Sequence, residues 1–370
     1  MRIAVLKETL PGERRVALIP DSVGRLVKAG HELLIQQGAG FSAGFTDDAY
    51  RAAGATLAAD PAATTSGAAI VCKVQKPAAD EVRLLAPGAV LVSLLPITTS
   101  ADLLPALASA GVTAFALERV PRITRAQAMD VLSSQATVAG YKAVLLGAEA
   151  LPRLLPMLTT AAGTLTPAKV FILGAGVAGL QAIATARRLG AVVSAFDVRP
   201  AAREQVMSLG ASFVAAVEVT AAAEDTGGYA KAQSEDEQRR TADAIHAHAK
   251  DMDLVISTAA VPGRRAPILL TEAMVRDMKP GSVIVDLAAE TGGNCALTQP
   301  GQTCEVGGVT IMGPLNLPST VPLHASQMFS RNVLTFLQHL ITKEGQIAID
   351  LNDEITGAMA VTHGGQVRVS

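Results

Sequence analysis

The chain has 370 residues, 49% of which are hydrophobic, and its formal net charge at pH 7 is -2. This length allows about two domains, and the near-neutral charge excludes the basic field that binding of nucleic acid or anionic lipid requires. Aromatic residues make up 3% of the chain and tryptophan is absent, which argues against a base-stacking surface.

The N-terminal third of the chain alternates short apolar runs with helix-like segments. The runs typical of buried strands are 2–8, 31–37, 68–74, 89–95 and 112–118. The helix-like segments between them are 20–30, 46–54 and 102–111. This alternation predicts a parallel sheet with crossover helices.

A second unit of the same kind follows a long helical stretch over about 125–151, which is punctuated by Gly140 and Gly147. Its strand-like runs lie at 169–176, 253–259, 282–288 and 309–316. A further helix is predicted over 324–342, and the tail 347–370 has the composition of strands and turns.

These elements predict an α/β fold with two doubly wound, Rossmann-like domains and a deep cleft between them. The first domain is expected to be discontinuous, with residues 1–132 completed by the C-terminal segment 320–370. The second domain is expected to cover residues 133–319. Because clefts between domains commonly hold ligands, we expect a cofactor at this junction.

The sequence VFILGAGVAG at 170–179 is the most specific motif of the chain. An apolar strand runs into Gly174, Gly176 and Gly179, and a helix opens behind them, as in the G-x-G-x-x-G fingerprint of dinucleotide-binding domains. Gly174 would permit the tight turn, Gly176 the approach of a pyrophosphate, and Gly179 the close packing of helix on strand. The alternative, a glycine-rich turn without a ligand, is disfavoured by the complete order of strand, glycines, helix and second strand.

The second strand of this motif ends at Asp197, where a carboxylate is expected to accept hydrogen bonds from the adenosine ribose. Arg199 lies two residues further on, and an arginine near this position can accept the 2′-phosphate of NADP. Because the charge of Asp197 would repel that phosphate, the sequence predicts NAD(H) rather than NADP(H).

No group of residues has the spacing of a metal site. The three cysteines, Cys72, Cys295 and Cys304, form no C-x-x-C pair, so neither a disulfide framework nor a zinc site is indicated. His246 and His248 are two residues apart on a predicted helix and therefore diverge. The start of the chain lacks the apolar segment of a signal peptide, and prolines interrupt the uncharged stretch 84–101, which favours a strand and loop over a membrane span.

Five segments together carry a family resemblance: GERRVALIP at 12–20, PRITRAQAMDVLSSQ at 121–135, the fingerprint with its helix at 174–191, GGYAK at 227–231, and KPGSVIVDLAAETGGNC at 279–295. With them the chain resembles the NAD(H)-binding domain I of the alpha subunit of proton-translocating NAD(P) transhydrogenase over essentially its whole length. The same superfamily contains alanine dehydrogenase.

The resemblance implies that Arg122, Gln127, Asp130 and Ser133 orient the dihydronicotinamide ring. Spacing agrees in part, because Gln127, Asp130 and Ser133 would share one face of a helix. An amide and a carboxylate can both hold the ring carboxamide, and Arg122 could pair with Asp130 or reach an oxygen of the cofactor. The alternative is an ordinary polar face behind a helix capped by Thr124.

Further cofactor contacts are expected from the second domain. The pyrophosphate would lie against Ala175, Gly176 and Val177, and the adenosine end against Asp197, Val198 and Arg199. Thr258, Ala259 and Ala260 would keep the groove open where a third strand ends. The segment 221–240 resembles the mobile loop of the family, in which Gly228 and Tyr229 would close over the nucleotide. Thr241 and His324 receive no role from the sequence.

The resemblance also implies partners. Hydride would pass directly from NADH to NADP⁺ held on a partner subunit, and a transmembrane component would couple this step to proton translocation. A homodimer is implied as well, located in the cytoplasm and associated peripherally with the cytoplasmic face of the inner membrane through those partners.

Two other functions remain as alternatives. An amino-acid dehydrogenase of the alanine dehydrogenase type needs a cation and a general acid or base beside the nicotinamide. By resemblance Arg15 is retained here, whereas Gln75 replaces the expected lysine and Pro96 the expected histidine, so this function is disfavoured. A non-catalytic NAD(H)-sensing module is disfavoured because it would not need to aim the nicotinamide ring through Arg122, Gln127 and Asp130.

Overall fold

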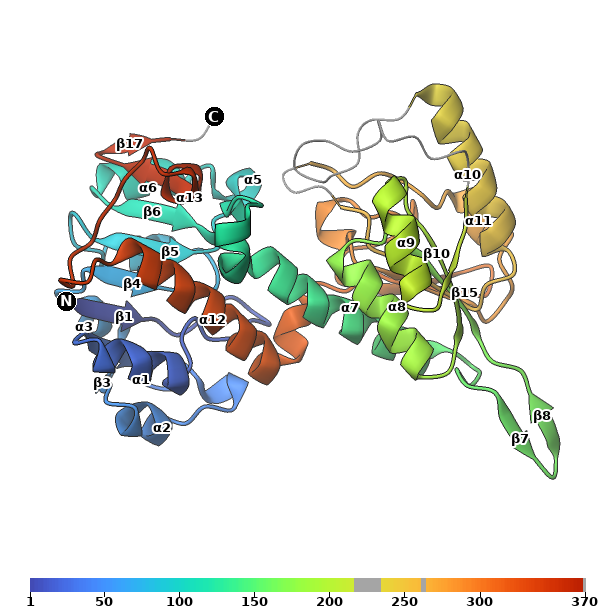
Figure 1. The fold of residues 1–370 in the computed structure, drawn as a ribbon, viewed down its shortest axis with the longest axis horizontal. Coiled ribbons are helices and arrows are strands. Elements are labelled where there is room, and N and C mark those ends of the chain that lie inside the picture. Colours follow the sequence, from blue (N-terminus) through green and yellow to red (C-terminus); the bar gives the residue numbers. More distant parts are fainter. Residues whose placement is uncertain (216–233, 261–263, 369–370) are drawn as a thin grey trace. The chain divides into compact units, whose positions relative to one another are not determined.

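The computed structural model describes residues 1–215, 234–260 and 264–368. The chain forms two compact units, one made of residues 1–135 and 318–370 and the other of residues 136–317 (Figure 1). The boundaries expected from the sequence, 132/133 and 319/320, stay a prediction for the limits of the folding domains.

The first unit contains an eight-stranded sheet in the order β17-β16-β6-β5-β4-β1-β2-β3. The strands are β1 (Arg2–Val5), β2 (Glu32–Gln36), β3 (Thr56–Ala58), β4 (Ile70–Cys72), β5 (Val90–Ser93), β6 (Thr113–Ala116), β16 (Ala360–His363) and β17 (Gln366–Val367). Strands β1 to β6 pair in parallel, as the sequence predicts, and β16 and β17 are antiparallel at one edge.

Both faces of this sheet are buried, which explains why its strands read as continuous apolar runs. Val5, Cys72 and Phe115 point into one core, and Ala4, Leu91 and Ala114 into another on the opposite face. The covering helices are α1 (Pro20–Lys28), α2 (Asp47–Ala52), α3 (Pro61–Thr65), α4 (Ala79–Val82), α5 (Ile97–Ser100), α6 (Leu103–Ser109), α12 (Pro322–Leu340) and α13 (Glu354–Met359). Short 3₁₀ turns lie at η1 (Phe41–Ala43), η2 (Leu117–Arg119) and η6 (Leu317–Thr320).

The C-terminal segment completes this unit. Phe329, Phe336 and Leu340 of α12 are fully buried in its core, and β16 pairs with β6. The tail was expected to hold only strands and turns, but it also contains α13. This helix begins because Asp353 accepts hydrogen bonds from the amides of the first turn, as an N-cap residue does.

The second unit contains a seven-stranded sheet in the order β11-β10-β9-β12-β13-β15-β14. Its strands are β9 (Lys169–Leu173), β10 (Val192–Phe196), β11 (Ser212–Phe213), β12 (Leu254–Ser257), β13 (Val283–Asp286), β14 (Thr303–Val306) and β15 (Val309–Met312). Except for β14, these strands pair in parallel. The order reverses between β9 and β12, which makes this edge of the sheet the switch point where doubly wound folds bind ligands.

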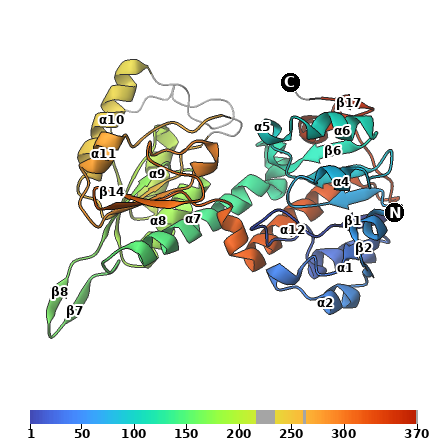
Figure 2. The same cartoon turned by 180° about the vertical axis from the view of Figure 1, so that it is seen from behind.

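The helices of the second unit are α8 (Val177–Arg188), α9 (Pro200–Ser208), α10 (Glu235–Ala249) and α11 (Glu272–Arg276), with a 3₁₀ turn at η5 (Ala289–Thr291). A hairpin of β7 (Leu158–Thr160) and β8 (Gly163–Leu165), not expected from the sequence, extends away from the sheet of this unit in both views (Figures 1 and 2). Within the described residues, no helix combines the length and the apolar composition that crossing a bilayer requires.

The long helix expected over about 125–151 is interrupted. A 3₁₀ turn, η3 (Thr124–Met129), precedes α7 (Val131–Ala150), and between them Asp130 adopts an extended conformation with ψ of 92°. The break has a local cause, because the Asp130 carboxylate accepts hydrogen bonds from the amide (2.9 Å) and the hydroxyl (2.6 Å) of Ser133. A side chain that bonds to the first turn of a helix starts that helix rather than continuing an earlier one.

The two glycines that punctuate α7 allow close packing within the second unit. A Cβ atom on Gly140 would lie 2.1 Å from the carbonyl oxygen of Ala178, in the first turn of α8, and one on Gly147 would lie 2.5 Å from a methyl group of Leu254. The first contact is with backbone, which cannot rotate away. Gly140 therefore allows α7 to support the start of α8.

We predict that Gly140→Ala lowers the free energy of unfolding by at least about 2 kcal/mol, because the added methyl overpacks against backbone. Gly24→Ala is the matched control, since Gly24 lies inside α1 and its added Cβ would make only ordinary contacts at 3.8 Å. That variant should be neutral or about 1 kcal/mol more stable through helix propensity. Urea unfolding followed by circular dichroism measures both, and equal effects of the two variants would contradict the packing role.

Candidate functional site

The fingerprint forms a turn between β9 and α8 that leaves no room for a side chain at its first glycine. Gly174 has a φ of +94°, and a Cβ atom there would lie 2.8 Å from Oγ1 of Thr258 and 3.1 Å from the amide nitrogen of Ala259. The turn therefore requires glycine for both its conformation and its surroundings.

The other two glycines have opposite environments. A Cβ atom on Gly179 would lie 1.8 Å from the carbonyl oxygen of Gly174, so α8 packs directly on the turn. A Cβ atom on Gly176, which precedes α8, would meet nothing within 4 Å. The first turn of α8 thus faces open space beside Gly176 and Val177, and the free amides of a helix start attract anions. This cradle fits a pyrophosphate.

Asp197 follows β10 and lies against the same turn. Its Oδ2 accepts a hydrogen bond of 2.7 Å from the amide of Ala175, which fixes the carboxylate beside the fingerprint. Arg199 donates to both oxygens, from its backbone amide and from its guanidinium group. Asp197 is 7% exposed, whereas Val198 is half-buried.

The end of β12 is held by a residue that sequence reasoning did not select. Thr258 donates from Oγ1 to the carbonyl oxygen of Gly174 (2.9 Å). The amide side chain of Asn294 bonds to both the N–H (3.0 Å) and the carbonyl oxygen (2.8 Å) of Ala259. Asn294 therefore sets the path of the backbone at Thr258, Ala259 and Ala260.

A buried carboxylate in turn positions Asn294. Asp286, at the end of β13, has no exposed surface, and accepts hydrogen bonds from the amide of Asn294 (2.7 Å), the amide of Cys295 (3.0 Å) and the hydroxyl of Ser257 (2.9 Å). The signal for this pair was an acidic residue at the end of an apolar strand, followed by G-G-N, within a segment that we used only for the family resemblance.

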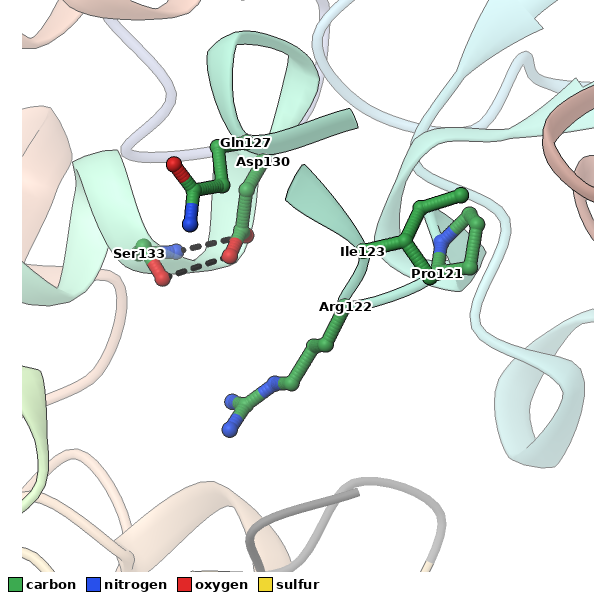
Figure 3. A pocket seen from close by; sticks show the side chains of 6 residues that line it. All are labelled: Pro121, Arg122, Ile123, Gln127, Asp130 and Ser133. Carbon is green, nitrogen blue, oxygen red and sulfur yellow. Dashed lines mark hydrogen bonds between the residues drawn. The ribbon is translucent and has the colours of Figure 1, made fainter. Parts of the chain in front are cut away.

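In the first unit, the four residues expected to orient the nicotinamide line one pocket together with Pro121 and Ile123. Figure 3 shows the Arg122 side chain extending into the open space, while Gln127, Asp130 and Ser133 lie together across from it. The expectation that Gln127, Asp130 and Ser133 share one helix is wrong, because η3 ends before Asp130 and α7 begins after it. The helix break nevertheless leaves all three side chains on one wall.

Arg15 lies in a separate buried network of the first unit. Its guanidinium group donates to both carboxylate oxygens of Glu13 (2.8 and 2.6 Å) and to Oε1 of Gln135 (2.8 Å). Gln75 donates to the same Glu13 (2.8 Å). Burial by itself would raise the pKa of Glu13, but the hydrogen bonds and charge of Arg15 outweigh it and lower this pKa to about 2.

The buried lysine nearest to Gln75 is engaged elsewhere. Lys73 is 1% exposed, bonds to Glu81 at 2.9 Å and lies 3.8 Å from Glu8. Glu8 accepts a hydrogen bond from the amide of Val74 (2.7 Å). Burial raises the pKa of Glu8 to about 7, although the charge of Lys73 and the bond from Val74 oppose the rise.

Several expected residues lie elsewhere. Gly228 and Tyr229 fall outside the described residues. Thr241 is buried in α10, and His324 is exposed in the first turn of α12. His246 bonds to Asp277 and His248 to Ser194, in different directions. Within the part of the chain that the structure describes, no three His, Cys, Asp or Glu residues are placed to hold a metal ion.

Comparison with known proteins gives matches along the chain. The family models described as alanine dehydrogenase/PNT, N-terminal domain and alanine dehydrogenase/PNT, C-terminal domain match residues 4–139 and 143–370. An NAD(P) transhydrogenase subunit alpha chain of Rhodospirillum rubrum is 48% identical to this chain, and the match covers 99% of this chain and 97% of that protein.

Solved structures agree with these matches. The crystal structure of a transhydrogenase from Sinorhizobium meliloti has 45% sequence identity and a TM-score of 0.91, and the match covers 100% of both chains. An L-alanine dehydrogenase structure has 30% identity and a TM-score of 0.84, covering 99% of this chain and 96% of that one. The chain is therefore more similar to this transhydrogenase than to this alanine dehydrogenase.

The raised pKa of Glu8 predicts a pH-dependent stability. Because the folded-state pKa of about 7 exceeds the ordinary value of 4.5, this group stabilises the fold fully below pH 4.5, and its contribution, about 3 kcal/mol, is lost as pH rises through 7. Glu8→Gln mimics the neutral carboxyl, so its free energy of unfolding should gain about that amount relative to the unmodified protein between pH 4.5 and 8.

Urea unfolding at several pH values measures this difference. The control is Glu204→Gln, which removes an exposed carboxylate from α9. If the difference between the Glu8 variant and the unmodified protein stays constant over this pH range, the raised pKa is wrong.

Proposed function

Because the chain belongs to the alanine dehydrogenase/PNT family, we propose that it is the NAD(H)-binding subunit of a proton-translocating transhydrogenase. Its activity is that of an oxidoreductase component, which exchanges hydride between NAD(H) on this chain and NADP(H) on another. The single observation that carries this proposal is the similarity to transhydrogenase alpha subunits over 99% of the chain.

The second unit supports the nucleotide-binding part of the proposal. The open space at Gly176 and the start of α8 fit the pyrophosphate of a dinucleotide. Ala175 and Val177 lie beside this cradle, Asp197 with Val198 and Arg199 would receive the adenosine end, and Thr258, Ala259 and Ala260 would border the groove. Binding of NAD(H) also agrees with the dehydrogenases in the family.

The pocket of the first unit supports the orienting part. Ser133 holds the Asp130 carboxylate through two hydrogen bonds, so this group has a fixed direction. Gln127 beside it offers both a donor and an acceptor, which is what a carboxamide requires. We assign Gln127, Asp130 and Ser133 to fixing the nicotinamide carboxamide, and Arg122 to an oxygen of the cofactor. Bound NADH would supply the hydride.

Direct hydride exchange between two nicotinamides needs no proton transfer on this chain, and the first unit suits that requirement. Lys73 is buried in ion pairs with Glu81 and Glu8, and Gln75 has no ionisable group to act as an acid. An alanine dehydrogenase activity is therefore disfavoured, although the fold alone would permit it. A purely NAD(H)-sensing role is disfavoured by the orienting set at Gln127.

The proposal assigns the remaining functions to partners. NADP(H) would bind to a partner subunit, and a transmembrane subunit would couple hydride exchange to proton movement. This chain would form a homodimer and attach through those subunits to the cytoplasmic face of the inner membrane. The name "subunit alpha" carried by the relatives supports an assembly of several chains.

One experiment distinguishes the three functions. The chain is mixed with NADH, an NADP(H)-binding partner and an oxidised NADP analogue, and a parallel sample receives pyruvate and ammonia instead. We expect reduction of the analogue only when the partner is present. Oxidation of NADH by pyruvate and ammonia would instead indicate an amino-acid dehydrogenase, and binding without reaction in either sample would indicate a sensor.

We predict that Gln127→Asn lowers the rate of hydride transfer about a hundredfold while NADH affinity changes little, since a shorter side chain misplaces the ring without removing the nucleotide contacts. Stopped-flow absorbance gives the rate, and fluorescence titration gives the affinity. Gln338→Asn, the same change at an exposed position of α12, is the control. Equal losses of rate and affinity would contradict the orienting role.

A further inference from the structure

The Asp197 carboxylate has no acceptor capacity left in this structure. An ionised carboxylate offers about four lone pairs. Its Oδ1 accepts from the amide (2.9 Å) and the Nε (3.0 Å) of Arg199. Its Oδ2 accepts from the amide of Ala175 (2.7 Å) and from a terminal nitrogen of Arg199 (3.0 Å). All four positions are therefore filled by the chain itself.

These four donors divide into two kinds. The amides of Ala175 and Arg199 belong to the backbone and fix the carboxylate, one on each oxygen. The other two belong to the side chain of Arg199, whose guanidinium bridges both oxygens in the bidentate geometry favoured by arginine and carboxylate. Two adjacent hydroxyl groups of a ribose would need to donate to the same two oxygens. The guanidinium thus occupies the positions that a vicinal diol would use.

We propose that Arg199 is a specificity-determining residue that competes with the ribose diol for Asp197 and must leave the carboxylate before an adenine nucleotide binds fully. This inference rests on the proposed NAD(H) site. The side chain of Arg199 is 21% exposed and precedes α9, so it has a route to solvent that the backbone amides lack.

Displacement has a second consequence for specificity. A released guanidinium beside Asp197 attracts a phosphate on the ribose 2′-oxygen, whereas the carboxylate repels it. Arg199 therefore lowers the affinity for nucleotides that carry a free diol and at the same time weakens discrimination against 2′-phosphorylated ones. Without this side chain, both the affinity for NADH and the preference for NADH over NADPH should rise.

Calorimetric titration of the full chain tests this competition with two probes, 5′-AMP and 2′,3′-dideoxy-AMP, which differ only in the diol. Arg199→Ala should bind 5′-AMP and NADH about tenfold more tightly than the unmodified protein, because nothing has to be displaced. Its affinity for 2′,3′-dideoxy-AMP should stay within about twofold. Arg199→Lys, which keeps the charge but loses the fork, should give an intermediate gain.

Arg203→Ala is the matched control, because it removes an exposed arginine that lies on α9, outside the hydrogen-bond set of Asp197; it should leave all affinities unchanged. Circular dichroism establishes that each variant is folded. Unchanged or weaker binding of 5′-AMP by Arg199→Ala would overturn the competition, and so would an equal gain for the dideoxy probe. Failure of the unmodified protein to bind NADH at all would instead overturn the proposed function.

Discussion

The carbonyl oxygen of Gly174 is the point on which the nucleotide-binding unit depends. It accepts the hydroxyl of Thr258 at 2.9 Å and lies 1.8 Å from where a Cβ atom on Gly179 would stand. Sheet, turn and helix therefore meet through backbone rather than side chains. This contact brings the start of α8 to the switch point of the sheet, with open space at Gly176. Asp197 is fixed against the same turn through the amide of Ala175.

The first unit follows a different principle, in which buried charges are neutralised within the chain. Arg15 is held by Glu13 and Gln135, and Lys73 by Glu81. Burying ions is costly unless partners and hydrogen bonds compensate them. Ionic groups arranged in this way support the structure and do not exchange protons with a substrate. That arrangement suits a subunit that presents a hydride donor and leaves the acceptor to another chain.

Sequence patterns predicted the parallel sheets, the fingerprint turn and the return of the C-terminal segment, because buried strands and glycine turns leave strong local signals. The break at Asp130 was not predicted, since one hydrogen-bonded pair with Ser133 overrides a continuous helical pattern. Asn294 and Asp286 were missed for another reason. Their roles arise from contacts between β12 and β13, which are distant in the sequence from the glycines they support.

The central claim is that hydride leaves this chain directly, without a proton-handling step on it. Transfer from NADH deuterated at C4 to an oxidised NADP analogue on the partner subunit, followed by mass spectrometry, tests it most directly. The claim predicts that the deuterium is recovered in the reduced analogue, with no exchange into water. Recovery of the label in solvent, or in alanine when pyruvate and ammonia are supplied, would contradict it.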